Sequence, residues 1–291
     1  MKVLVGILAH SDSPELQRQI EALRSHARLQ PRFVVFNGGR DHDLVRHIGE
    51  QEHPESEPLK YGNLAMFHLR VLESASKFDV DFLITMDSDV WPGLQSWDHR
   101  IVQYASEHNA DYLGNDFAAV KREPYEPGTC ARMLWHRGWK EITGSVAPYR
   151  AGNCVQVFGR NYFHAVEGAS AILEEVIPQS NVFGLEEILW PSFAVGHGMV
   201  VYKFPVPQPL RVSRKRWQAD ELAEALPTSF GLVHPCSSAE MAMFRDGDDL
   251  TTRENYIRFG GMWRKRDWKT AVSVRWERQM RVARCRFVSR W

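Results

Sequence analysis

Two aspartates, Asp87 and Asp89, carry the clearest chemistry in this sequence, because they close the apolar segment 82–90. Residues two positions apart in a strand point the same way, so both carboxylates can reach one point. Mg²⁺ and Mn²⁺ prefer oxygen ligands and are held by one or two carboxylates plus substrate phosphates. The pair therefore predicts a site for a metal-bound diphosphate. The alternative is a turn in which the aspartates only cap the segment that follows.

The elements around this pair predict an α/β protein. Short apolar runs bounded by turn residues indicate buried strands, and apolar spacings of three and four indicate helices. The expected elements are strands at 3–9, 33–36, 82–86, 112–114, 155–158 and 200–204, helices at 15–26 and 63–78, and helix plus loop within 40–58. The β-α-β-α-β order of the first 90 residues is typical of a doubly wound parallel sheet, whose ligands bind beyond the carboxyl ends of the strands.

On these residues the sequence resembles nucleotide-sugar-dependent glycosyltransferases of the GT-A fold, over about residues 1–240. The resemblance implies a Rossmann-type, mostly parallel sheet flanked by helices. It also implies that a DxD motif binds a divalent metal, Mn²⁺ or Mg²⁺, and the diphosphate of the donor, for which a UDP-sugar is the first expectation. The donor-binding positions that it implies are His10, Ser11, Asp12, Asn37, Gly38, Arg40, Lys60, Asn63, Asp87, Ser88, Asp89 and Gly152. Gly152 belongs to segment 149–153, which is expected to be a loop before a strand.

Two further features extend the resemblance. Segment 183–189 is similar to the part of inverting members that carries the general base, which places Glu187 in that role with Glu186 as its neighbour. The alternative is a helix N-terminus enriched in acids, which the helix dipole favours. His234 matches a late histidine that serves some members as a further metal ligand beside Asp87 and Asp89, although a lone histidine is often structural. A retaining enzyme carries the same DxD motif, so the stereochemistry stays open.

The charge distribution divides the chain into a catalytic domain, 1–252, and a basic extension, 253–291. The formal net charge is zero, but the extension has 12 basic and 3 acidic residues. From residue 272 an apolar stripe at helical spacing runs between arginines, which is typical of a basic amphipathic helix. Segment 272–291 is expected to contact an anionic membrane surface or to dock on the catalytic domain. No nucleic-acid-binding motif accompanies it, so a specific nucleic-acid partner is not expected.

These features predict an enzyme of polysaccharide biosynthesis in the cytoplasm, peripheral on the inner face of the cell membrane. Its acceptor is expected to be a cell-surface or lipid-linked saccharide, and its oligomeric state is left open. The four cysteines form no CxxC pair, which favours reduced thiols. Of the ten tryptophans, those expected to stack on an acceptor sugar are Trp135, Trp139 and Trp190.

Two other function classes stay open from the sequence alone. One is a sugar-1-phosphate nucleotidyltransferase on a similar sheet, although the glycine-rich loop of that class is missing after the first strand. The other is a non-catalytic membrane- or nucleic-acid-binding protein that uses the basic end. Motifs typical of hydrolases, P-loop proteins and dinucleotide-binding proteins are absent from the sequence.

Overall fold

The computed structural model describes most of the first 234 residues. The described residues are 1–10, 13–46, 48, 50–59, 64–120, 138–144, 147–180, 184–205 and 230–234. Several predicted features lie outside them, namely Ser11, Asp12, Lys60, Asn63, Trp135 and the basic segment 253–291 with its stripe from 272. The boundary between a catalytic domain and an extension therefore stays a prediction.

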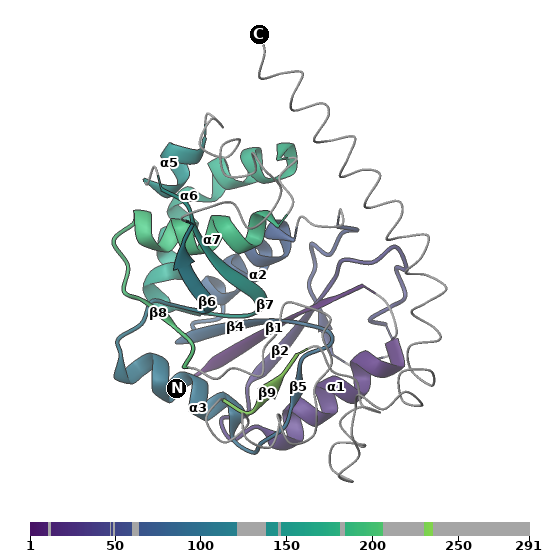
Figure 1. Ribbon diagram of the computed structural model, residues 1–291. Coiled ribbons are helices and arrows are strands. Elements are labelled where there is room, and N and C mark those ends of the chain that lie inside the picture. Colours follow the sequence, from purple (N-terminus) through teal and green to yellow (C-terminus); the bar gives the residue numbers. More distant parts are fainter. Residues whose placement is uncertain are drawn as a thin grey trace, which may run out of the picture.

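A seven-stranded, mostly parallel sheet forms the centre of the described chain (Figure 1). Its order is β3-β2-β1-β4-β7-β6-β8, and β7 runs antiparallel to both of its neighbours. The strands are β1 (Val3–Ala9), β2 (Arg32–Asn37), β3 (Gln51–Glu52), β4 (Phe82–Asp87), β6 (Tyr112–Ala119), β7 (Tyr149–Gly159) and β8 (Val201–Lys203). Every residue of β1 is buried, as expected for a central parallel strand that is covered on both faces. The predicted α/β class is confirmed.

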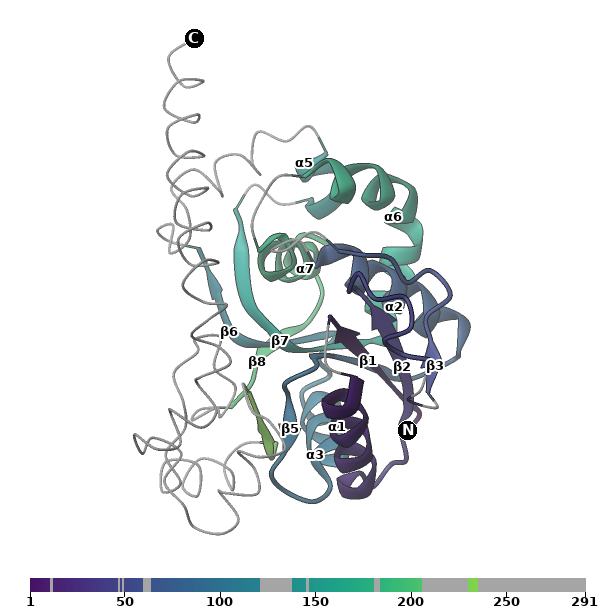
Figure 2. The ribbon, with the colours of Figure 1, turned by 90° about the vertical axis from the view of Figure 1, so that its right-hand side faces the viewer.

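Helices cover both faces of this sheet, as the edge-on view in Figure 2 shows. One face carries α1 (Ser13–His26) and α3 (Trp97–Glu107), and the other carries α2 (Ala65–Lys77), α5 (Trp139–Thr143), α6 (Arg160–Gln179) and α7 (Leu185–Gly196). Side chains of a strand alternate between the faces. Accordingly Leu4 and Leu8 join the core under α2, whereas Val5 and Ile7 join the core over α1.

One local prediction is wrong. The expected helix within 40–58 does not form in the described part of that segment, which consists of turns and the two-residue edge strand β3. Leu44 and Val45 are nevertheless buried in the core beside α1. Two prolines, Pro54 and Pro58, and the lack of a sustained apolar period leave too little to support a helix here.

The fold brings three strand ends together at one edge of the sheet. In the parallel register Leu8 of β1 is opposite Asp87 of β4, and Ala9 is opposite Asn37 of β2. The carboxyl ends of β1, β2 and β4 are therefore side by side, as the sequence predicts. This edge is where a doubly wound sheet presents its ligand site.

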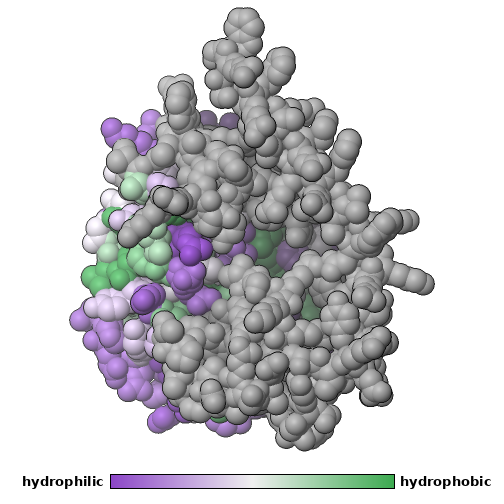
Figure 3. Space-filling view, in the orientation of Figure 1, coloured by the Kyte–Doolittle hydropathy of each residue, from purple (hydrophilic) through white to green (hydrophobic). Residues whose placement is uncertain are grey.

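The described surface has few large apolar side chains exposed to solvent. Those that are exposed are Met1, Val200 and Tyr202. In the face drawn in Figure 3, hydrophobic and hydrophilic side chains are interspersed over the coloured part of the surface. Within the described residues, every helix is too short or too polar to cross a bilayer.

Candidate active site

The end of β4 presents the two predicted aspartates at the shared edge. Asp87 is the last residue of the strand, and the N–H of Val90 donates to the Asp87 carbonyl at 3.3 Å, which closes a turn around Ser88 and Asp89. The chain then enters a short strand, β5 (Trp91–Pro92). The turn therefore projects Asp89 beyond the sheet while Asp87 stays anchored in it.

A two-stranded ladder brings His234 to the same turn. Strand β9 (Leu232–Val233) pairs antiparallel with β5, and His234 follows it directly. Gly231 enters this ladder with a φ of +81°, and its carbonyl accepts the N–H of Gly93 at 2.6 Å. A Cβ at Gly231 would be 2.7 Å from Cβ of Leu94, so the close approach of the two segments requires glycine.

Three potential ligand groups meet at this point. The imidazole Nε2 of His234 is 3.0 Å from a carboxylate oxygen of Asp89 and 3.7 Å from one of Asp87. One ligand atom of each residue can be chosen so that all three atoms are within 4.8 Å of one another. Two carboxylates and one imidazole suit Mn²⁺ well and also accept other divalent cations. The geometry thus fits the divalent metal that the DxD motif predicts.

Burial and mutual charges shift the pKa values of Asp87 and His234. The pKa of Asp87 is raised to about 7, chiefly by burial; the charge of His234 lowers it, and the charges of Asp89 and Glu187 contribute to the increase. Burial lowers the pKa of His234, but contacts with Cys154 and Asp89 outweigh burial and leave that pKa well above its usual value. The raised pKa favours the protonated form of the imidazole beside the carboxylates. A metal that binds here must displace that proton.

The two predicted glutamates lie in the first turn of α7, where they take different roles. Helix α7 follows Gly184, whose φ is +68°. Glu186 is 2% exposed, and its carboxylate accepts the N–H of Leu64 at 3.0 Å and the side-chain amide of Asn153 at 3.4 Å. Burial, together with the charges of Glu187 and Asp87, raises the pKa of Glu186 to about 8, although the hydrogen bond from the Leu64 N–H lowers it. Glu186 thus ties α7 to the start of α2 and to β7.

Glu187 is buried next to Glu186 in the first turn of α7. It is 8% exposed, and its charge raises the pKa of Asp87 and that of the Tyr112 hydroxyl. A Cβ added at Gly184 would be 3.8 Å from a carboxylate oxygen of Glu187. Both glutamates therefore interact electrostatically with Asp87 at the DxD end of β4, and both also fit the helix-terminus explanation.

The predicted nucleoside-binding positions form a tight junction between β1 and β2. The N–H of Gly38 donates to the Ala9 carbonyl at 2.8 Å, and a Cβ at Gly39 would be 2.5 Å from the carbonyl oxygen of His10. Loss of water around the His10 imidazole lowers its pKa, although the charge of Asp89 acts in the opposite direction. The charge effect places the His10 ring within electrostatic range of the metal trio.

Asn37 has a local structural role in this junction. Its side-chain oxygen accepts the N–H of Gly39 at 3.1 Å, and its amide donates to the Asp41 carbonyl at 2.8 Å. The side chain is 4% exposed, whereas Arg40 is exposed. Asn37 therefore shapes the turn, and Arg40 is one of the solvent-exposed residues beside it.

Two predictions around the second half of the site are wrong. Segment 149–153 is not a loop but the start of β7, where Gly152 pairs with Asn115 of β6 next to an irregular register. Trp139 and Trp190 are 4% and 0% exposed, so they belong to the core and cannot stack on an acceptor sugar. Large aromatic side chains mostly fill cores, and here that tendency prevails.

Sequence reasoning also missed residues that the fold places around the trio. Asn153 holds Glu186, and Cys154 is fully buried in contact with His234. Neither position has a spacing that relates it to the DxD motif. These residues come close to the site because β7 pairs antiparallel with β4. That pairing joins residues more than 60 positions apart, so the local sequence gives no sign of it.

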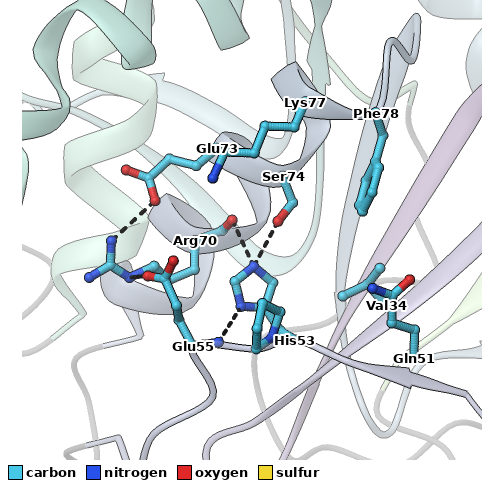
Figure 4. Close-up of a pocket in the computed structure, with 10 residues that line it drawn as sticks. Val34, Gln51, His53, Glu55, Arg70, Glu73, Ser74, Lys77 and Phe78 are labelled. Carbon is cyan, nitrogen blue, oxygen red and sulfur yellow. Dashed lines mark hydrogen bonds and ion pairs between the residues drawn. The ribbon is translucent and has the colours of Figure 1, made fainter.

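A separate cavity of about 120 Å³ lies between β2, β3 and the end of α2 (Figure 4). His53 lines it, with Nε2 donating to the Arg70 carbonyl at 3.1 Å and to Ser74 Oγ at 2.7 Å. Its Nδ1 accepts the N–H of Glu55 at 3.2 Å, so both ring nitrogens are occupied. The His53 imidazole therefore connects β3 to α2 through hydrogen bonds and does not act as a base for Ser74. The cavity lies apart from the edge of the sheet that carries Asp87 and Asp89.

Comparison with solved structures finds similarity in the backbone fold at low sequence identity. A galactosyltransferase, LgtC, in complex with donor and acceptor sugar analogues is 12% identical, with 87% of this chain and 98% of that chain covered and a TM-score of 0.43. The mannosyltransferase PcManGT from Pyrobaculum calidifontis, in complex with GDP-Man and Mn²⁺, is 9% identical, with 70% and 55% covered and a TM-score of 0.40. CMP:2-keto-3-deoxy-manno-octonic acid synthetase with CTP is 12% identical, with 71% and 90% covered and a TM-score of 0.40. Neither a protein-family model nor a curated protein matches the sequence.

Proposed function

We propose that this chain is a metal-dependent glycosyltransferase that moves a sugar from a nucleotide-diphosphate sugar to a hydroxyl acceptor. The observation that carries the proposal is the meeting of Asp87, Asp89 and His234 at the carboxyl edge of a mostly parallel sheet. A bound Mn²⁺ or Mg²⁺ would neutralise the charge that develops on the leaving diphosphate. The aspartates and the imidazole would hold that cation, and the junction formed by His10, Gly38 and Arg40 would hold the nucleoside.

Glu187 is the residue proposed to take the proton from the acceptor hydroxyl as its oxygen attacks the anomeric carbon. Its charge raises the pKa of Asp87 and that of the Tyr112 hydroxyl, which supports its assignment to this site. Glu186 is not proposed to share this task, because Leu64 and Asn153 already engage its carboxylate. This assignment makes the enzyme inverting. Its acceptor is proposed to be a cell-surface or lipid-linked saccharide of a polysaccharide pathway.

The basic segment 272–291 is proposed to hold the enzyme on the anionic inner face of the cell membrane. Its positive charge supports this proposal. Deletion of residues 262–291 should abolish sedimentation with anionic vesicles and leave turnover of a soluble acceptor intact. Loss of turnover with unchanged vesicle binding would instead favour docking of the segment on the catalytic domain.

The test of the proposed activity is sugar transfer from UDP-, GDP-, CDP- and dTDP-sugars with Mn²⁺ and with EDTA. We expect transfer from one donor class, which EDTA removes and added Mn²⁺ restores. Asp89→Asn and Glu187→Gln should each abolish transfer, while Glu186→Gln should retain it. Metal-independent transfer that survives Asp89→Asn would refute the proposal. Release of pyrophosphate from a nucleoside triphosphate and a sugar phosphate would identify a nucleotidyltransferase instead.

A further inference from the structure

One side chain of α1 departs from the pattern of its helix. Leu16, Ile20 and Leu23 form the apolar face that packs on the sheet, and position 19 is on the same face because it is three residues after 16 and four before 23. The residue there is Gln19, and it is 0% exposed. A buried polar side chain at a core position calls for a specific explanation.

The explanation is visible in its contacts with the DxD turn. Nε2 of Gln19 donates to the carbonyl of Asp87 at 2.9 Å and to the carbonyl of Val90 at 2.8 Å. Only the amide nitrogen can donate to a carbonyl, so the orientation of the amide is determined. These two carbonyls bracket Ser88 and Asp89. One side chain of α1 therefore holds both ends of the turn that presents Asp89.

Gln19 is a poor choice for stability alone. Among the described residues its buried Oε1 has no hydrogen-bond partner, and an unsatisfied buried acceptor costs free energy that offsets part of the gain from the two hydrogen bonds made by the nitrogen. A methionine of similar shape would remove that acceptor, but it would leave the buried carbonyl of Val90 without the donor that Gln19 supplies. The specific effect of the amide is therefore on the turn, whose two end carbonyls it joins.

We propose that Gln19 is a positioning residue that sets the affinity of the site for its divalent cation. The inference rests on the proposed function, since it concerns the same trio. Asp89 is the more exposed of the two carboxylates, with a side chain 49% accessible, and it is the one whose oxygen is 3.0 Å from His234. Without the two hydrogen bonds from Gln19, the turn must be ordered when the metal binds, and this ordering weakens binding.

The experiment compares Gln19→Met with Ile20→Val, a control from the same buried face whose apolar side chain donates no hydrogen bond to the turn. Mn²⁺ affinity is measured on the full chain by electron paramagnetic resonance, and exchange of the turn amides by hydrogen–deuterium mass spectrometry. We expect Gln19→Met to weaken Mn²⁺ binding about 10- to 100-fold and to speed exchange across residues 87–90, while Ile20→Val changes neither by more than about twofold. Saturating Mn²⁺ should restore the turnover of Gln19→Met, because the ligands themselves are intact.

Two outcomes would overturn the inference. One is Mn²⁺ affinity and turn exchange in Gln19→Met that match those of wild type. The other, which needs no variant, is rapid solvent exchange of the Gln19 side-chain amide protons in the wild-type protein by NMR. If wild type binds no Mn²⁺, the proposed function fails instead, and the exchange measurements still decide whether Gln19 holds the turn.

Discussion

Glu186 should make the metal-free protein less stable as the pH rises from 5 to 8. Its folded-state pKa is about 8, against an ordinary value of 4.5. The folded state therefore binds more protons than the unfolded state between these values. The stability associated with the neutral acid is fully present below pH 4.5 and is lost as the pH rises through 8. Each pH unit is worth about 1.4 kcal/mol, so three units correspond to roughly 4 kcal/mol.

Glu186→Gln isolates this effect, because glutamine copies the neutral acid in shape and its side-chain oxygen can still accept the N–H of Leu64. The assay is urea unfolding in EDTA at pH 5, 6, 7 and 8. We expect the variant and the wild type to have similar free energies of unfolding at pH 5. At pH 8 the variant should be more stable than the wild type, and the difference should equal the stability that the wild type has lost through ionisation of Glu186. Asp87 has a raised pKa as well, so the variant should retain part of the pH dependence. Identical pH slopes in the two proteins would refute the assignment of a neutral, buried Glu186.

Three further predictions concern the scaffold. Gly196→Ala should be severely destabilising, because its Cβ would be 1.1 Å from the Thr143 carbonyl oxygen. Gly168→Ala has nothing within 4 Å of its Cβ and should stabilise α6 by about 0.5–1 kcal/mol. Thermal unfolding of the two variants checks this, and equal melting temperatures would contradict it. Asp98→Ala should lower the free energy of unfolding in urea by about 2–3 kcal/mol, because the buried carboxylate accepts two backbone N–H groups of the α1–β2 loop at 2.8 and 2.7 Å. A decrease below about 0.5 kcal/mol would argue against that role. Burial lowers the pKa of His68 to about 4, so the free energy of unfolding should fall as the pH drops from 6.5 toward 4. His68→Phe should remove that part of the pH dependence. An unchanged dependence of stability on pH between 6.5 and 4 would show that His68 is accessible to protons in the folded state.

The strands and helices that could be predicted are those whose buried residues form a recognisable hydrophobic pattern along the chain. The run that forms β1 is apolar throughout and has the predicted bounds, and the polar residues after β1, β2 and β4 do converge. Segment 40–58 has no such pattern, and its buried Leu44 and Val45 depend on tertiary contacts. Local patterning therefore predicted the parallel half of the sheet and the DxD edge.

The rest of the site depends on long-range pairing. His234 was suggested only by a family resemblance, and it reaches the aspartates through a two-residue ladder between segments about 140 positions apart. Gln19 looked like an ordinary polar residue of α1, because its partners are backbone carbonyls at Asp87 and Val90 that the sequence does not display. Gly152 was placed in a loop by the family resemblance alone, whereas in the structure it pairs with Asn115 of β6 next to a register shift.

The most direct test of the central claim is titration of the full-length chain with Mn²⁺ by isothermal calorimetry, with a nucleotide-diphosphate sugar panel present. The account predicts one Mn²⁺ per chain, binding that weakens below neutral pH as His234 and Asp87 retain their protons, and loss of binding in Asp89→Asn and His234→Ala. Wild-type stoichiometry and affinity in both variants would contradict it, because the cation would then be held elsewhere.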